Sequence, residues 1–160
     1  MLFRSARNDF LDVYILNKCD FLLNGGTGMF IFRAISNLPT LFGDIYRVVK
    51  TFYFEDLVLF QKVWLIRENR LATVGEMVAM GDNFSDERHQ ERLGVRLVKN
   101  TADELLAACD EMIARLSGTW VTTQEDEILQ KRYWDLICES GHHEGRIGAQ
   151  FLRDNQDLLR

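Results

Sequence analysis

The residues best suited to bind a ligand form a glycine-rich stretch near the start of the chain, Asn24-Gly25-Gly26-Thr27-Gly28. This stretch follows a short apolar run and precedes another, a pattern that predicts a strand, a tight loop and then a helix. Free backbone N–H groups at the start of a helix attract phosphate, and glycines lack the Cβ atoms that would keep a diphosphate away. The threonine hydroxyl can add one hydrogen bond. All five residues are therefore our candidate substrate-binding residues.

The loop does not meet the stricter phosphate-binding motifs. It contains no G-x-x-x-x-G-K-[ST] sequence, and Ile31 occupies the place of the third glycine of a dinucleotide fingerprint. The alternative interpretation is a tight turn in which the glycines only permit a positive φ angle. Asn24 fits both interpretations, because its amide can bond a ribose or phosphate and can equally cap the turn.

Two glutamates, Glu76 and Glu104, could have either a structural or a ligand-binding role. Glu76 follows Thr73, and Glu104 follows Thr101, at the T-x-x-E spacing of a helix capping box. This spacing favours a structural role for both glutamates, although Glu76 also suits contact with the ribose of a nucleotide. Arg4, Arg7 and Asp9 lie near the start of the chain. An arginine there suits a contact with the donor phosphate, and a solvated or frayed terminus is the alternative interpretation.

No set of residues has the spacing of a catalytic triad or a metal centre. Cys138 and His142 lie one helical turn apart without further ligands, and His142 and His143 cannot point the same way from a helix. His89 lies among charged residues that are typical of a solvated helix face. We therefore assign no catalytic residue, no metal and no cofactor.

Apolar periodicity and capping residues predict an alternation of strands and helices. Strands are expected at 20–24, 39–43 with an extension at 45–50, 56–64 and 94–100. Helices are expected at 9–18 and 29–38, after the capping residues Thr73, Ser85, Thr101 and Thr123, and at 145–158. Strands that alternate with helices favour a parallel sheet. The predicted fold class is α/β, a Rossmann-like three-layer domain with a mainly parallel sheet and a helical C-terminal segment.

The composition predicts one ordinary globular domain spanning residues 1–160. Hydrophobic residues make up 47% and charged residues 27%, and the chain has a single proline and no linker-like stretch. The net charge of −5, without a Lys/Arg-rich block, argues against nucleic-acid binding. No apolar run reaches the ~18 residues of a membrane span, so no transmembrane segment is expected. Three cysteines without paired spacing indicate reduced thiols and a cytoplasmic location.

Residues 7–28, RNDFLDVYILNKCDFLLNGGTG, resemble a segment of a bacterial family of glycosyltransferases. In that family a D-F-x-D-x-Y stretch leads into a helix, followed by C-x-F on a strand, a Gly/Ser/Thr-rich loop, a helix and a proline. The matching residues here are Asp9, Phe10, Asp12, Tyr14, Cys19, Phe21, the 24–28 loop and Pro39. Later stretches resemble further family segments in the same order, so the resemblance covers nearly the whole chain: 69–81, 94–112 and 146–159.

The resemblance implies the C-terminal lobe of a two-lobed glycosyltransferase of the GT-B type, in which each lobe is Rossmann-like. In that class the C-terminal lobe binds the nucleotide-sugar donor, its glycine-rich loop faces the diphosphate, and a metal ion is generally not needed. The acceptor and often the catalytic base belong to the N-terminal lobe, which we expect to be absent from residues 1–160. The implied function is donor binding for sugar transfer to a glycan or lipid-linked acceptor in bacterial surface polysaccharide synthesis. Relatives usually carry a serine beside the glycine, whereas this loop reads NGGTG.

A second class of function stays open. The chain could be a non-catalytic or degenerate fragment that packs against a partner lobe or a second copy of itself. The candidate surface for this role is the mostly apolar run at 52–66. Such a run belongs to the core by default, but apolar surface left uncovered by a missing lobe would drive association.

Overall fold

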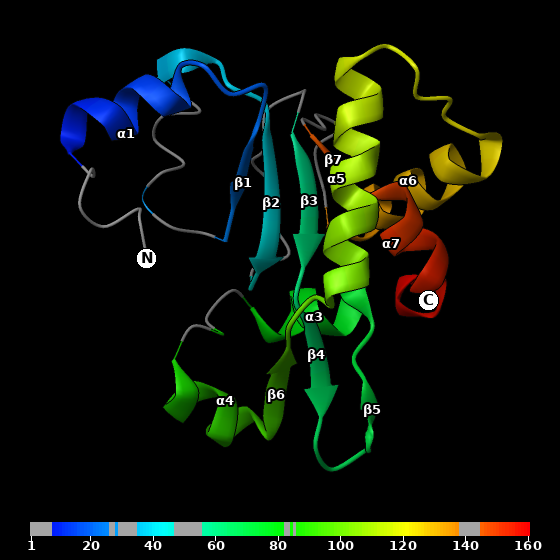
Figure 1. The fold of residues 1–160 in the computed structure, drawn as a ribbon. Helices are drawn as coiled ribbons and strands as arrows, with labels where there is room; N and C mark the ends of the chain where they lie inside the picture. The colour runs from blue at the N-terminus through cyan, green and yellow to red at the C-terminus, as the bar shows by residue number, and fades with distance from the viewer. Residues whose placement is uncertain are drawn as a thin grey trace.

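The computed structural model describes residues 8–25, 28, 35–46, 56–81, 84, 86–137 and 145–160. Within these residues the strands form a four-stranded sheet and a three-stranded sheet (Figure 1). The arrows of β2 and β3 point toward the smaller sheet, so the carboxyl ends of these two strands face it. The protein is therefore a mixed α/β protein, as the sequence predicts.

The larger sheet is parallel throughout. Its strands are β1 (Leu22–Asn24), β2 (Thr40–Ile45), β3 (Leu57–Phe60) and β7 (Arg146–Ile147), in the order β1-β2-β3-β7. The strands predicted at 20–24 and 39–43 are confirmed, and so is the parallel sheet. The order follows the sequence without a reversal among the described strands. Open α/β sheets bind ligands where the strand order reverses, and the described strands of this sheet contain no such point.

The smaller sheet is antiparallel. Its central strand is β4 (Lys62–Leu65), which lies between β5 (Arg70–Leu71) and β6 (Val95–Val98). The extended structure predicted at 56–64 is confirmed, but it forms two strands in two sheets, separated by Gln61. The strand predicted at 94–100 is β6. The sequence analysis did not predict a separate antiparallel sheet.

Helix starts follow the capping residues closely. Helix α1 (Asp9–Leu16) is capped by Asn8, whose Oδ1 accepts from Leu11 N at 2.7 Å. Helices α3 (Val74–Met80) and α5 (Ala102–Leu116) both begin with the predicted capping boxes. Helix α6 (Gln124–Ile137) begins after Thr123, whose Oγ1 accepts from Asp126 N at 3.2 Å.

The helix predicted after Ser85 is α4 (Glu87–Leu93), and its cap is Asp86. Ser85 itself lies outside the described residues. Of the helix predicted at 29–38, residues 35 and 36 are helical, and 29–34 lie outside the described part. Most of the predicted extension at 45–50 also lies outside it.

The helix predicted at 145–158 is wrong in its first part. Residues 146–147 form β7, followed by the short helix α7 (Ala149–Asp154) and the 3₁₀ helix η1 (Gln156–Leu159). Arg146 pairs with Leu57, and Gly148 N donates to Val58 O at 3.2 Å. The open edge of β3 therefore holds this segment extended, and a tertiary partner overrides local helix preference.

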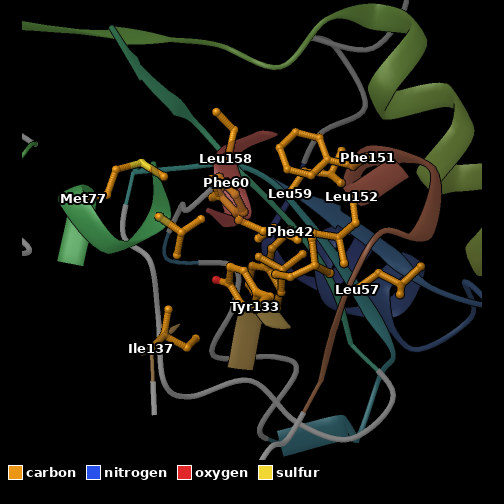
Figure 2. Close-up of a cluster of buried hydrophobic side chains, with 14 of the residues drawn as sticks. Phe42, Leu57, Leu59, Phe60, Met77, Tyr133, Ile137, Phe151, Leu152 and Leu158 are labelled. Carbon is orange, nitrogen blue, oxygen red and sulfur yellow. The ribbon is translucent and has the colours of Figure 1, made fainter. Parts of the chain in front are cut away.

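The core lies on β3 and the helices packed around it (Figure 2). All four residues of β3 are buried, as expected of a strand covered on both faces. The Phe60 ring stacks on Tyr133 of α6 with centroids 5.6 Å apart, and meets Phe151 of α7 edge to face at 5.0 Å. Helix α5 contacts β2, β3 and α7. The apolar run at 57–60 is therefore core, which is the default interpretation of its composition.

Candidate functional site

The glycine loop begins at the carboxyl end of β1. Asn24 is the last residue of that strand and is 2% exposed, whereas Gly25 and Gly28 are exposed. Gly26 and Thr27 lie outside the described residues. The predicted strand-to-loop boundary is therefore confirmed, with one buried polar side chain at the boundary and exposed backbone beyond it.

Within the described part of the chain, no backbone angle or packing contact requires glycine at position 25 or 28. Neither Gly25 nor Gly28 has a positive φ angle. A Cβ atom built on either residue would meet no heavy atom of the described residues within 4 Å. At these two positions the structure gives no support to a turn that relies on positive φ. Open space in front of uncrowded backbone is what close approach by a ligand requires.

Other glycines in the chain have evident structural reasons. Gly81 and Gly94 have φ angles of +83° and +67°, which L side chains rarely adopt. A Cβ on Gly43 would lie 2.7 Å from Leu105 Cδ2, and one on Gly148 would lie 2.8 Å from Leu59 Cδ2. Gly25 and Gly28 show no such reason among the described residues, and neither does Gly75 within α3.

The backbone beside the loop is held by a pair of residues that the sequence analysis missed. Asn24 pairs with Phe42, and directly after Phe42 the register of β2 against β3 shifts. At this irregularity Asp44 has φ +55°, and its N–H donates to Asn100 Oδ1 at 2.7 Å. Asn100 N donates back to Asp44 Oδ1 at 2.7 Å, and Asn100 Nδ2 donates to Phe60 O at 3.1 Å.

This pair connects the carboxyl ends of β2 and β3 to the loop between β6 and α5. Asn100 is buried and makes all of these bonds from one side chain and its own N–H. The backbone next to Asn24 is thus fixed by tertiary hydrogen bonds. The sequence signal was weak: Asp44 tolerates a positive φ angle better than most residues, but nothing local links it to Asn100.

An unused acceptor lies at the same edge of the sheet. Gln61 directly follows β3, and its Oε1 is buried without a hydrogen-bond partner within the described part of the chain. Neighbouring strands are about 4.8 Å apart, so β1 and β3 are separated by about 10 Å.

Glu76 has a structural role. Its carboxylate accepts from Thr73 N at 2.8 Å, and Arg70 donates to it from both guanidinium ends, at 2.8 and 2.6 Å. The hydrogen bond from Arg70, followed by that from Thr73 N, lowers the pKa of Glu76 to about 2. These partners occupy both carboxylate oxygens, which supports the capping interpretation over contact with a ribose.

Glu104 is likewise committed to the fold. It accepts from Thr101 N at 2.7 Å and forms an ion pair with Lys62 Nζ at 2.6 Å. Burial disfavours its ionised form, but the hydrogen bonds from Lys62 and Thr101 outweigh burial and lower its pKa. The structural role predicted for Glu104 is confirmed.

The remaining candidates give no site. Cys138, His142, His143, Arg4 and Arg7 lie outside the described residues, and so does the side chain of Asp9. The His89 ring lies beside Arg92, with Nδ1 and Nη2 2.6 Å apart. In the part of the chain that the structure describes, no group of three His, Cys, Asp or Glu residues is arranged to hold a metal ion.

The structure is that of a mixed α/β protein in which exposed Gly25 directly follows the carboxyl end of a parallel strand, and Gly28 is also exposed. Comparisons with protein-family models, curated proteins and solved structures found no significant match to this chain. None of the helices within the described ranges has both the length and the apolar content that a membrane span requires.

Proposed function

We propose that this chain is the donor-binding lobe of a glycosyltransferase, and that residues 24–28 hold the diphosphate of a nucleotide sugar. The observation that carries the proposal is the freedom of Gly25 and Gly28 from conformational and packing constraints, at the carboxyl end of β1. Backbone N–H groups in such a loop stabilise negative charge on the diphosphate, which is the leaving group in sugar transfer.

The sequence resemblance supplies the reaction class, which is transfer from a nucleoside-diphosphate sugar to a glycan or lipid-linked acceptor. A cytoplasmic location and a role in surface polysaccharide synthesis belong to the same proposal. We assign no catalytic base to the chain. The proposal therefore concerns donor binding, and it can be tested without an acceptor.

The experiment is a thermal-shift panel of nucleoside diphosphates and their sugars. A ligand at one hundred times its Kd stabilises the fold by about 2.7 kcal/mol, which gives a clear rise in Tm. We expect a rise that is selective for one base. A flat panel from folded protein would contradict the proposal and favour the non-catalytic fragment.

Adding a methyl group at the loop tests the assignment of the site. Gly25→Ala and Gly28→Ala should fold normally, because the Cβ positions are empty. Each should weaken nucleotide binding by at least about tenfold, or ~1.4 kcal/mol, by crowding the phosphate. Isothermal titration calorimetry measures the change.

Gly75→Ala is the matched control. The same methyl group there meets only ordinary contacts, the nearest being Leu136 Cδ2 at 3.9 Å, and it lies within α3. It should raise stability by ~0.5–1 kcal/mol through helix preference and leave nucleotide binding unchanged. Equal binding in the wild type and both loop variants would reject the loop as the phosphate site.

The rival interaction role has less support from the fold. The predicted partner surface was the run at 52–66, yet Leu57, Val58, Leu59 and Phe60 are at most 2% exposed. These residues are committed to the core and are not available to a partner. Ile66, at the end of the run, is 56% exposed.

A further inference from the structure

A cavity of about 510 Å³ lies at the amino ends of the parallel strands, whereas the glycine loop follows the carboxyl end of β1. It opens at the amino ends of β3 and β7, where Asp56 and Arg146 lie, and is walled by the end of α5 and one side of α6. Small-molecule sites commonly have volumes of about 300–1,000 Å³. Its apolar lining residues are Leu57, Met112, Leu116 and Trp134.

Gln130 lines the cavity and has a side-chain hydrogen-bond donor without an acceptor in the described part of the chain. It is 4% exposed, and its Oε1 accepts from Ile147 N at 3.0 Å. That bond fixes the orientation of the amide, since Nε2 cannot accept from a backbone N–H. Nε2 therefore presents donors, and no described residue accepts from it.

Arg146 also lines the cavity and has a donor that no described residue satisfies. One end of its guanidinium donates to Glu127 Oε1 at 2.8 Å, but its Nε is buried and has no acceptor among the residues that the structure describes. A buried donor without a partner destabilises the folded protein. Within the described ranges Arg115 Nη2 is also buried without a hydrogen bond, although it lies 2.7 Å from Glu111 Oε1 and is paired with it by charge. The two donors of Gln130 and Arg146, which have no partner of either kind among the described residues, point to a missing acceptor.

The charges around the cavity indicate what kind of acceptor fits. Arg115 and Lys131 line it together with Arg146, but each of these cations has a carboxylate partner within the chain. Asp56 and Glu127 also line it. This balance suits one oxyanion group and opposes a polyanion such as a polyphosphate.

We propose that this cavity binds a small organic anion. Its carboxylate or phosphate oxygens accept from Gln130 Nε2 and Arg146 Nε, and its apolar body lies against the wall that includes Trp134. The site is separate from the nucleotide site proposed above. Because the strands are parallel, the cavity lies at their amino ends and the glycine loop at their carboxyl ends.

The test is an NMR titration that follows the side-chain signals of Gln130 Nε2–H₂ and Arg146 Nε–H. The probes are benzoate and phenyl phosphate, which carry an aromatic body with each type of oxyanion. Inorganic phosphate supplies the anion alone, and benzyl alcohol supplies the body alone. We expect benzoate or phenyl phosphate to shift both signals, and to bind at least about tenfold more tightly than either partial probe.

The variant Gln130→Glu keeps the bond that the amide oxygen accepts from Ile147 N and removes the donor that the proposed ligand would use. A glutamate oxygen still accepts from Ile147 N, but a carboxylate replaces the donor, so probe binding should fall by at least about tenfold. Gln124→Glu is the matched control, because it adds the same charge at an exposed position of α6. Arg146→Lys keeps the charge and removes Nε–H, and it should also weaken binding.

Three results would overturn the proposal. The first is that neither wild-type signal moves with benzoate or phenyl phosphate. The second is that inorganic phosphate or benzyl alcohol binds as well as the aromatic anions. The third is that Gln130→Glu or Arg146→Lys binds like the wild type. If Gln130→Glu does not fold, the wild-type titration and Arg146→Lys decide the matter by themselves.

Discussion

At the scale of single residues, Glu76 shows how a capping residue gains a second function in the fold. Its carboxylate closes the N-terminus of α3 and also binds Arg70, which belongs to β5. The capping half of this arrangement is local, because Thr73 and Glu76 are only three positions apart, and it could be predicted from T-x-x-E. The bond to Arg70 depends on where β5 places the guanidinium, so the sequence pattern alone did not reveal it.

The lowered pKa of Glu76 predicts a pH dependence of stability. A carboxylate whose pKa falls on folding stabilises the protein above its unfolded pKa, and that contribution is lost as pH falls through the folded pKa. For Glu76 the window runs from about 4.5 down to about 2. Glu76→Gln should therefore flatten the fall of Tm in this window, as measured by scanning calorimetry.

The comparison must be made against the wild type, because Glu104 and Asp126 also have lowered pKa values and respond in the same direction. Glu91→Gln, an exposed substitution on α4, serves as the control and should leave the pH profile unchanged. An identical profile for Glu76→Gln and wild type would show that the bonds to Glu76 do not persist in solution.

At the scale of elements, the sequence predicted structure where the cause is local and missed it where the cause is distant. The starts of α3, α5 and α6 follow from threonines that bond three residues ahead. β7 forms because residues 146–147 meet the open edge of β3, and α7 begins where Ala149 N donates to buried Glu111 Oε2 at 2.6 Å. Neither partner of this segment is visible from its own sequence.

A substitution at Gly148 tests how closely this segment approaches β3. A Cβ there would lie 2.8 Å from Leu59 Cδ2 and 3.8 Å from Ala108 Cβ, in a fully buried part of the core. Gly148→Ala should lower the free energy of unfolding by about 1–3 kcal/mol through overpacking. Urea denaturation measures the change. Gly75→Ala adds the same methyl group without crowding and should not destabilise; equal stability of both variants would contradict the close approach of Gly148 to β3.

At the scale of the whole molecule, a parallel sheet was predictable but its division from a second sheet was not. The residues at 56–64 were predicted as one extended segment, yet Gln61 N donates to Ile45 O at 2.8 Å and β4 then pairs with β6. The division into two strands therefore depends on tertiary pairing, which the hydrophobic pattern does not specify. For the candidate site, the loop boundary at Asn24 was predicted, whereas the Asp44–Asn100 pair joins residues 56 positions apart and was missed.

Asn100 is expected to stabilise the connection between the two sheets. Asn100→Ala would leave Asp44 N and Phe60 O without their partner, and an unpaired buried group costs about 1–3 kcal/mol. We expect a loss of ~2–4 kcal/mol in chemical denaturation.

Asn100→Asp is the sharper variant. It keeps an acceptor for Asp44 N but loses the donor to Phe60 O and places two carboxylates together. It should also destabilise the fold, and more so at neutral pH than at acidic pH, because protonation removes the repulsion. Wild-type stability in Asn100→Asp would mean that the bond to Phe60 contributes nothing.

The contribution of residues 146–159 to the core also bears on how the chain folds during synthesis. Phe60 packs against Phe151, and Leu158 and Leu159 complete the same cluster. On the ribosome, β3 is made long before these residues emerge, so one edge of its backbone and part of its apolar surface stay uncovered in the meantime. The nascent chain is therefore expected to depend on chaperones until its C-terminal segment can add β7 and close the core.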